Sequence, residues 1–359
     1  MTDVVTRVTG RIGRITLNRP KVLNALTHDM VRVLDDTLAG WEHDDRIRVV
    51  VVDGAGERGL CAGGDIRSVY TDARRGGTAS LAFWADEYRL NARIAQYPKP
   101  YVALMDGLVS GCGLGVSAHG SVRVVTERTR IGVPEVGIGL APDAGVTYLL
   151  SRAPDRLGVH IALTGTYLSA GDAIHCGLAD SYVPSGRIPQ MLRALENGSK
   201  PQIAALSVAQ LPPDRPVSRQ AEWLAGCYAA PTVEEILARL TTRGGPGISA
   251  SREILTKSPT ALKVSLRALR EAAKLPTLEE VLNLEYRISA ACLRGPDLVE
   301  GIRAQIIDKD QKPRWTPAAL ADVTDEAVAG HFAGLGSQEL GLEAPLPEPA
   351  LWAGRGFDR

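Results

Sequence analysis

The first half of the chain repeats one hydrophobic pattern: a short β-rich run, a Gly-rich turn and then a stretch with helical spacing. Five short runs of alternating or continuous apolar residues predict strands, at residues 14–17, 47–52, 101–105, 122–126 and 181–183. Residues 24–41 predict a helix, because their apolar residues recur at intervals of three and four. Strands that alternate with helices favour parallel pairing, so the pattern predicts an α/β core.

The pattern changes beyond about residue 190, where strand signals end and helix signals take over. Ser258 before Pro259 is typical of a helix N-cap, and Thr277 with Glu280 is typical of a capping box. We therefore expect three parts: a core at residues 1–190, a variable linker or helical segment at 191–250, and a helical region at 251–359 that ends in an extended tail of fifteen residues.

Composition and charge narrow the classes of partner. Lys plus Arg equals Asp plus Glu, 41 residues each, so we expect neither a nucleic-acid partner nor a membrane surface. The five cysteines are widely scattered, which fits neither a disulfide framework nor a metal site and indicates a reducing compartment. The N-terminus lacks the regions of a signal peptide, and no apolar run approaches the ~20 residues of a membrane span. We expect a cytoplasmic protein, for which a homo-oligomer is an open alternative.

Two Gly-rich turns, at residues 59–66 and 106–120, each stand between a predicted buried strand and a helix. Backbone N–H groups at a helix start are unpaired, and glycine lets a ligand approach them closely. Two such turns facing one another would make a two-donor pocket for an oxyanion, as thioester chemistry requires, with each donor contributing ~3 kcal/mol. The alternative is that the glycines only permit tight turns.

Carboxylates form the second candidate feature. Glu135 and Asp143 lie eight residues apart in a stretch that is otherwise apolar and stiffened by prolines. Burial would raise their pKa values and make one of them a competent acid, base or nucleophile. A surface loop with two solvated acids is the alternative. Glu87 is a further candidate on a predicted helix, where a solvated carboxylate is the ordinary outcome.

Two other motifs compete with this interpretation. Residues 54–59 match the G-x-G-x-x-G pattern of a nicotinamide dehydrogenase, but their glycines do not open a helix directly, and no second buried strand ends in an acid about twenty residues later. Cys112, at a predicted helix N-terminus, could be a catalytic thiolate. No histidine has spacing that supports such a pair, yet we expect an accessible Cys112 to be the most reactive of the five thiols.

In combination, the motifs resemble the crotonase superfamily of enoyl-CoA hydratases and isomerases. Its pattern is matched in order by LNRPKVLNAL (17–26), CAGGDI (61–66), the Gly-rich turn at 111–115 and the PE pair at 134–135. Longer segments resemble its subgroup of 3-hydroxyisobutyryl-CoA hydrolases, which take part in valine breakdown. These segments include RVVTERTRIGVPEVGIGLAPDAG and NLEYRISAACLRGPDLVEGIRAQIIDKDQKPRW. The similarity covers residues 11–185 and 250–317.

The resemblance implies a crotonase-like spiral of ββα repeats with a helical C-terminal region, and an acyl-CoA site within residues 1–190. CoA would then be part of the substrate, and neither a cofactor nor a metal is implied. The N–H groups of Gly64 and Cys112 would form the oxyanion hole, Glu135 and Asp143 would be catalytic, and Glu87 would bind substrate. The backbone that holds CoA would belong to Leu23, Ala25, Leu26, Ala62, Gly63, Asp65 and Ile66.

Two positions favour hydrolysis over hydration within this resemblance. An enoyl-CoA hydratase carries a second glutamate where this chain has Gly115, and a glycine where it has Asp143. One carboxylate could attack the thioester or activate water while the other orients a β-hydroxyl, roles that Glu135 and Asp143 fit. The alternatives are a hydratase or isomerase of the same superfamily, and an NAD-dependent dehydrogenase.

Cys112 departs from the subgroup, which usually has glycine at this position. If the site requires a positive φ, the cysteine side chain would strain the oxyanion hole. This departure is the one argument for a further alternative, a catalytically silent acyl-CoA-binding protein.

Overall fold

The computed structural model describes residues 2–212 and 214–344 and confirms the alternation of strands and helices in the first half of the chain. The strands are β1 (Val4–Thr9), β2 (Ile12–Leu17), β3 (Val49–Gly54), β4 (Gly59–Cys61), β5 (Tyr101–Met105), β6 (Leu108–Ser110), β7 (Val122–Val125), β8 (Arg130–Gly132), β9 (Tyr167–Leu168) and β10 (Ser181–Tyr182). The strand predicted at 101–105 has the same bounds in the structure. The sequence pattern does not predict β4, β6, β8 and β9, since two or three residues carry no readable periodicity.

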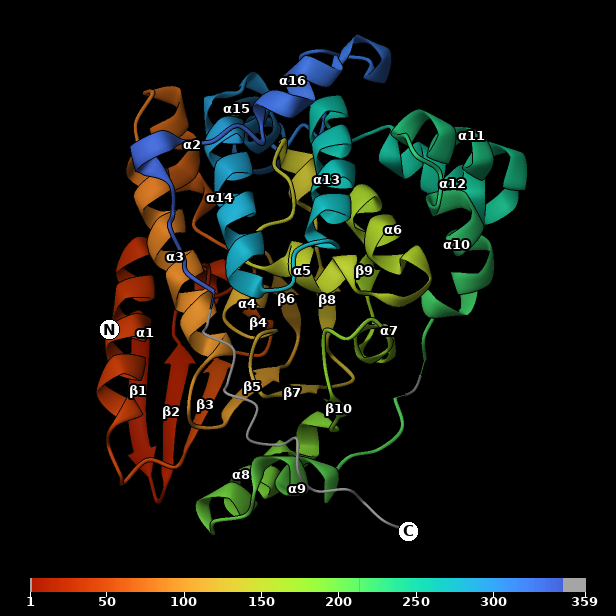
Figure 1. The fold of residues 1–359 in the computed structure, drawn as a ribbon. Helices are drawn as coiled ribbons and strands as arrows, with labels where there is room; N and C mark the ends of the chain where they lie inside the picture. The colour runs from red at the N-terminus through yellow and green to blue at the C-terminus, as the bar shows by residue number, and fades with distance from the viewer. Residues whose placement is uncertain (1, 213, 345–359) are drawn as a thin grey trace, which may run out of the picture.

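Among the described residues the strands form two sheets, ordered β1-β2-β3-β5-β7-β10 and β4-β6-β8-β9. The successive pairs β3–β4, β5–β6 and β7–β8 each give their first strand to one sheet and their second strand to the other. Most neighbours pair in parallel, as predicted, while β1 with β2 and β8 with β9 are antiparallel. This winding confirms the expected spiral of ββα repeats (Figure 1).

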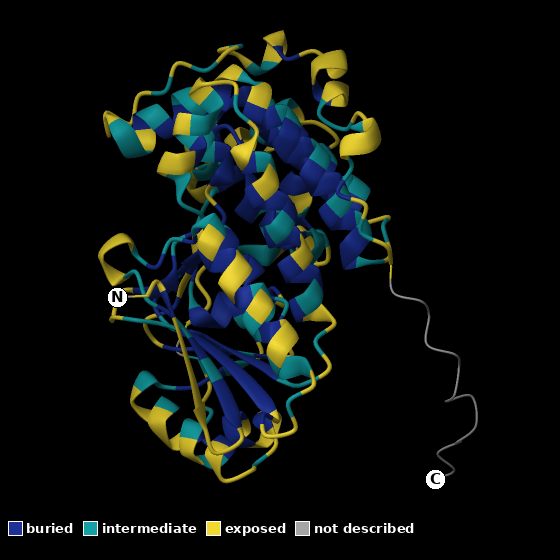
Figure 2. Cartoon of the chain, turned by 90° about the vertical axis from the view of Figure 1, so that its left-hand side faces the viewer, coloured by how far each residue is buried: buried dark blue, intermediate teal, exposed yellow. Residues whose placement is uncertain are grey.

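The six-stranded sheet is buried on both faces, as the β-branched run in β3 indicates. Val50 and Val52 pack into the main core beside α1 (His28–Glu42) and α3 (Ala79–Ala95). Val49 and Val51 pack into a second cluster with α8 (Ile188–Glu196) and α9 (Pro201–Leu206). Figure 1 shows these two helices below the sheet, and Figure 2 shows the central strands as buried. Both faces of the sheet are therefore covered by helices.

In Figure 1 most of the remaining helices lie above or beside the sheets, with α1 at the left beside β1 and β2. They are α1 (His28–Glu42), α2 (Ile66–Arg74), α3 (Ala79–Ala95), α4 (Cys112–Gly115), α5 (Val146–Ser151), α6 (Leu157–Thr164), α7 (Ala170–His175), α10 (Ala221–Tyr228), α11 (Val233–Arg243), α12 (Gly245–Ile254), α13 (Pro259–Ala272), α14 (Leu278–Arg294), α15 (Pro296–Ile302) and α16 (Asp325–Gly330). α1 begins four residues later than predicted, because Leu23 and Asn24 both take a left-handed φ of 55°.

The C-terminal helices begin where the sequence predicts. The Ser258 hydroxyl accepts a 3.0 Å hydrogen bond from the N–H of Ala261, and Thr277 forms its capping box with Glu280. α14 packs against α3 and α5, and α13 packs against α5 and α6, so this region covers the core. Within the described ranges, none of the helices combines the length and apolar character needed to cross a membrane. The tail predicted to be extended, residues 345–359, lies outside the described residues.

Candidate active site

The two Gly-rich turns lie against one another, as predicted. A Cβ placed on Gly111 would lie 3.4 Å from the Cα of Gly63, and a Cβ placed on Gly64 would lie 3.1 Å from the Sγ of Cys112. Gly111 also has a φ of 50°, which L side chains rarely adopt. Glycine at these positions therefore allows two backbone segments to approach more closely than side chains would permit.

The N–H groups of Gly64 and Cys112 have no acceptor among the hydrogen bonds of the described residues. Cys112 is the first residue of α4, where a backbone N–H has no partner within the helix. Gly64 precedes Asp65, the N-cap of α2, so it is a donor from a loop and not, as predicted, from a helix start. The two predicted oxyanion donors are thus neighbours with free N–H groups.

The structure tests two expectations about Cys112. The positive φ belongs to Gly111, so the cysteine does not strain the turn. The side chain is 5% exposed, and burial, followed by the nearby Glu87 carboxyl, raises the pKa of the thiol well above its ordinary value. We expect high reactivity only of an accessible thiol, and this condition is not met: the loss of hydration opposes the effect of a helix start that is only four residues long.

The two segments expected to hold CoA run side by side. The N–H of Ala62 donates to the carbonyl of Leu23 at 3.0 Å, the N–H of Leu26 donates to Gly63 at 2.9 Å, and the N–H of Asp65 donates to Leu26 at 2.8 Å. A pocket of about 270 Å³ opens beside them, and its lining includes Leu26, Asp65 and Phe83. The structure therefore brings together the predicted positions at residues 23–26 and 62–66 next to a cavity.

The three predicted acidic residues are buried, so the alternative of solvated surface acids is wrong. Glu135 is 5% exposed, Asp143 is 4% exposed and Glu87 is 0% exposed. Glu135 begins a single 3₁₀ turn, η2 (Glu135–Ile138), and its Oε1 lies 3.5 Å from the Cβ that a side chain at Gly111 would have. Its Oε2 has no hydrogen-bond partner, and neither carboxyl oxygen of Glu87 has one. Carboxyl groups are thus held next to the oxyanion donors with free hydrogen-bonding capacity.

Two residues that the sequence analysis did not single out fix Asp143. The hydroxyl of Tyr88 on α3 donates to Asp143 Oδ2 at 3.0 Å. The same hydroxyl lies 3.0 Å from Oγ of Ser289 on α14. Tyr88 directly follows Glu87, so one helix supplies both side chains, and the C-terminal region closes the cluster from the opposite side.

Glu285 on α14 is a fourth buried carboxyl group of this region. Its Oε2 accepts from the N–H of Gly145 at 2.7 Å, and its Oε1 accepts from the N–H of Thr147 at 3.0 Å, at the start of α5. A carboxyl group on the apolar face of a helix is the signal that could have identified it, because Leu282 and Ile288 share that face. Glu285 anchors the loop that carries Asp143.

Burial dominates the electrostatics of the cluster. It raises the pKa of Asp143 to about 6, against the hydrogen bond from Tyr88, which lowers it. Burial raises the pKa values of Glu87 and Glu135 well above the ordinary value, and the charge of Asp143 raises both further. Burial and the charge of Asp143 thus both disfavour a second negative charge in the cluster, on Glu87 or on Glu135.

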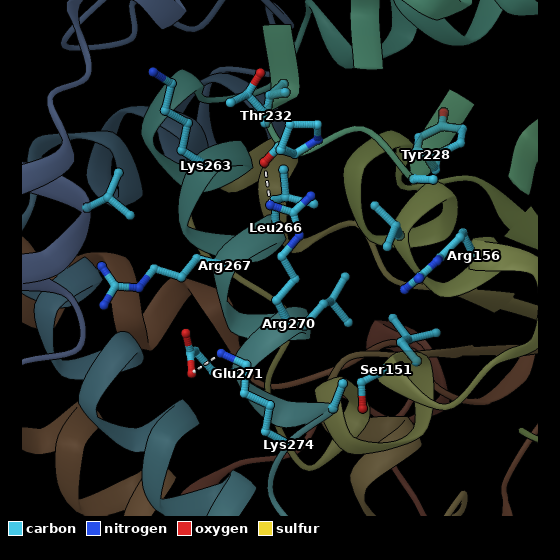
Figure 3. A pocket seen from close by; sticks show the side chains of 18 of the residues that line it. Ser151, Arg156, Tyr228, Thr232, Lys263, Leu266, Arg267, Arg270, Glu271 and Lys274 are labelled. Carbon is cyan, nitrogen blue, oxygen red and sulfur yellow. Dashed lines mark hydrogen bonds and ion pairs between the residues drawn. The ribbon is translucent and has the colours of Figure 1, made fainter. Parts of the chain in front are cut away.

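A wider cavity, of about 810 Å³, lies between α5, α6, α11 and α13 (Figure 3). Most of its cationic side chains are already engaged: Arg270 donates to backbone carbonyls, Lys263 pairs with Glu234, and Lys274 pairs with Glu271. Neither the Gly-rich turns nor the carboxyl cluster contribute to its lining. The wider cavity is therefore separate from the turns and from the carboxyl cluster, whereas the lining of the smaller pocket includes Asp65 of the first turn.

A family model described as enoyl-CoA hydratase/isomerase matches residues 12–332. The chain belongs to the enoyl-CoA hydratase/isomerase family. Among curated members of this family, the chain is 42% identical to the mitochondrial 3-hydroxyisobutyryl-CoA hydrolase of Gallus gallus, over 95% of the chain and 91% of that protein. It is 40% identical to the corresponding human protein, over 94% of the chain and 90% of that protein.

Solved structures of family members superpose closely on this chain. A carnitinyl-CoA dehydratase from Mycobacterium thermoresistibile is 50% identical, with a TM-score of 0.91, and the match covers 95% of this chain and 98% of that chain. An enoyl-CoA hydratase from Rhodobacter sphaeroides is 40% identical, with a TM-score of 0.89, and the match covers 95% of this chain and all of that chain. The fold is thus that of the family.

Proposed function

We propose that this family member hydrolyses the thioester of a short β-hydroxyacyl-CoA, namely 3-hydroxyisobutyryl-CoA in valine breakdown. The observation that carries the proposal is the position of Glu135, whose carboxyl group lies beside the oxyanion donors with Oε2 unpaired. Gly115 supplies no second carboxylate on the other side. The names of the curated relatives support the same substrate.

In the proposed reaction, the thioester carbonyl oxygen accepts hydrogen bonds from the N–H groups of Gly64 and Cys112. Negative charge that develops on this oxygen is stabilised by the two donors. Glu135 acts in one of two ways. It either attacks the carbonyl carbon and forms an anhydride that water then cleaves, or it removes a proton from the attacking water. In both routes the C–S bond breaks, and the CoA sulfur leaves as a thiolate that takes up a proton.

Glu135 must carry negative charge when it reacts, although burial and the charge of Asp143 both raise its pKa. We propose that the proton of Glu135 passes toward Asp143 when substrate binds, so the pair keeps one charge throughout. Glu87 remains protonated and donates a hydrogen bond to the substrate. None of these steps needs a metal or a separate cofactor, so we expect activity to persist in a chelator.

The CoA part would lie along the backbone of residues 23–26 and 62–66, at the entrance formed by the 270 Å³ pocket. The glycines there let a ligand approach the main chain, and backbone carbonyl groups, each with two lone pairs, can accept further hydrogen bonds from the polar parts of CoA. A cytoplasmic location and assembly into a homo-oligomer stay predictions, and neither changes this chemistry.

Hydration of an enoyl-CoA is the second candidate, because the two solved structures that superpose on this chain are named a carnitinyl-CoA dehydratase and an enoyl-CoA hydratase. The test is a panel of acyl-CoA esters followed by two readouts, release of free thiol and loss of enoyl absorbance. We expect thiol release with 3-hydroxyisobutyryl-CoA and little change in enoyl absorbance with any enoyl-CoA. Fast loss of enoyl absorbance without thiol would overturn the hydrolase proposal.

A further inference from the structure

Asn91 on α3 is a buried polar side chain whose amide makes no hydrogen bond. It is 0% exposed, and both its Oδ1 and its Nδ2 lack a partner. Buried amides are normally hydrogen-bonded because they lose water without compensation otherwise. Most unpaired buried polar atoms in the described residues belong to the site, to Glu87, Asn91 and Glu135. The unpaired amide of Asn91 therefore belongs to a region whose buried polar atoms are available to hydrogen-bond a ligand.

The position of Asn91 in α3 points it toward the same region. Phe83, Glu87 and Asn91 are spaced by four residues, so they share one face of the helix. Phe83 lines the 270 Å³ pocket and lies against Gly64, and Glu87 is the buried acid of the cluster. The face thus runs from the pocket at the entrance, past the acid, to the Asn91 amide at its inner end.

Asn91 also packs beside α4, the helix that begins with the proposed oxyanion donor Cys112. A Cβ placed on Gly115 would lie 2.8 Å from Nδ2 of Asn91 and 2.9 Å from the Cβ of Ala144. Gly115 stands three residues after Cys112 in α4, about 4.5 Å along the helix axis. In an acyl chain, the β-carbon is two bonds of about 1.5 Å from the carbonyl carbon. A β-substituent on an ester whose carbonyl lies at Cys112 can therefore reach the amide.

We propose that the Asn91 amide binds the β-hydroxyl of the acyl chain and so sets the preference of the enzyme for hydroxylated esters. A hydroxyl group is both donor and acceptor, and the amide offers an unpaired atom of each kind. A site that pairs its buried polar atoms with a substrate hydroxyl discriminates against the analogue that lacks it. This inference rests on the proposed hydrolase function and adds to it the residue that reads the acyl group.

The test compares kcat/KM for 3-hydroxyisobutyryl-CoA and for isobutyryl-CoA, which differ only by the hydroxyl. We expect the wild type to prefer the hydroxylated ester, and Asn91→Leu to reduce that preference by at least about tenfold. The loss should fall on the hydroxylated ester, while isobutyryl-CoA keeps its rate within about threefold. Equal losses for both esters, or an unchanged preference, would overturn the proposal. A wild type that releases no thiol from either ester would instead refute the proposed function.

A second pair of measurements separates recognition from folding. Ser265→Ala, on α13, is the matched control because its Oγ is also fully buried and unpaired, and we expect its ester preference to be unchanged. Binding is measured by calorimetry in a Glu135→Gln background, where the ester is not consumed. In that background, Asn91→Leu should weaken the binding of the hydroxylated ester and leave the binding of isobutyryl-CoA unchanged. If Asn91→Leu does not fold, Gly115→Ala displaces the amide instead and must lower the same preference for the proposal to stand.

Discussion

Tyr88 donates a 3.0 Å hydrogen bond to Oδ2 of Asp143, and both side chains are buried. The bond opposes the effect of burial, which raises the pKa of Asp143 to about 6. Above that pH Asp143 carries a charge, and this charge raises the pKa values of Glu87 and Glu135. Tyr88 therefore influences where the charge of the whole cluster lies, although it does not itself reach the thioester.

Replacing Tyr88 with phenylalanine should move the acidic limb of the pH profile. We expect wild-type kcat/KM to fall as the pH drops through about 6, the pKa of Asp143. Tyr88→Phe removes a hydrogen bond that favours the charged form, worth ~1.5–3 kcal/mol. One pH unit corresponds to about 1.4 kcal/mol, so the limb should move up by about one to two units. The measurement is kcat/KM against pH.

Tyr101→Phe is the matched control for this shift. Tyr101 is equally buried, and its hydroxyl donates to the carbonyl of Val116 at 2.9 Å, away from any carboxyl group. The control should lose a hydrogen bond worth ~1 kcal/mol of stability. The acidic limb of its kcat/KM profile should stay at the wild-type pH. A Tyr88→Phe profile that coincides with the control would remove Asp143 from the rate-determining ionisation.

The same substitution at two buried glutamates should have different effects. Glu135→Gln should lower kcat by ~10²–10⁴-fold while ester binding survives, because an amide cannot attack a carbonyl or accept a proton. Glu87→Gln should cost far less, since a protonated carboxyl group and an amide can both donate a hydrogen bond. Steady-state rates give the loss of kcat in each variant, and calorimetry shows whether each still binds the ester. A Glu135→Gln protein with most of its kcat would eliminate Glu135 as the reacting group.

A labelling experiment distinguishes the two routes open to Glu135. In a single turnover in ¹⁸O water, the isotope enters the Glu135 carboxyl group only if an anhydride forms and water attacks its glutamyl carbonyl carbon, whereas general-base catalysis leaves the glutamate unlabelled. Peptide mass spectrometry reads the result.

Much of this architecture follows from the sequence. The β-branched run in β3, the Ser258 N-cap and the Thr277 capping box are local patterns. The two caps lie at the predicted residues, and the strand lies two residues later than predicted. The family resemblance names Gly64 and Cys112 as donors, and the close approach of their two turns could be anticipated because glycine next to a strand end indicates it. These features depend only on neighbours in the sequence.

Contacts between distant segments could not be predicted in the same way. Tyr88 and Ser289 are separated by 201 positions, and nothing local to either residue indicates that their hydroxyl groups meet. The environment of Cys112 also depends on distant residues, since a helix start suggests a lowered thiol pKa while burial raises it. Burial decides the chemistry here, and burial is a tertiary property.

The buried state of Cys112 leads to a prediction about its reactivity. All five cysteines are buried, so we expect an alkylating agent to label none of them rapidly in the folded protein. Cys112→Gly should keep kcat within about threefold, because the proposed donor is the backbone N–H. Timed alkylation with mass spectrometry and the steady-state rate test the two statements. Loss of activity by orders of magnitude in Cys112→Gly would instead favour a thiolate nucleophile.

The last prediction concerns conversion to a hydratase. The resemblance to hydratases suggests that Gly115→Glu with Asp143→Gly would restore their pair of acids. In this chain a Cβ at residue 115 would lie within 3 Å of both the Asn91 amide and the Ala144 methyl group. Gly115→Glu alone should therefore lose ~1–3 kcal/mol of stability from overpacking. Denaturant unfolding measures this loss.

Hydration should appear only after the space around residue 115 is cleared. Asn91→Ala removes the nearer contact, and Ala144→Gly removes the other at a position whose φ of 56° suits glycine. We expect Gly115→Glu with Asp143→Gly to show no hydration of an enoyl-CoA, and the protein with all four substitutions to show measurable hydration and no thiol release. The decisive experiment therefore compares the rate at which these two proteins reduce the absorbance of an enoyl-CoA. If the first already hydrates, the Asn91 side chain does not exclude a second acid from the site, and the choice between hydrolysis and hydration must lie with Asp143 and Gly115 alone.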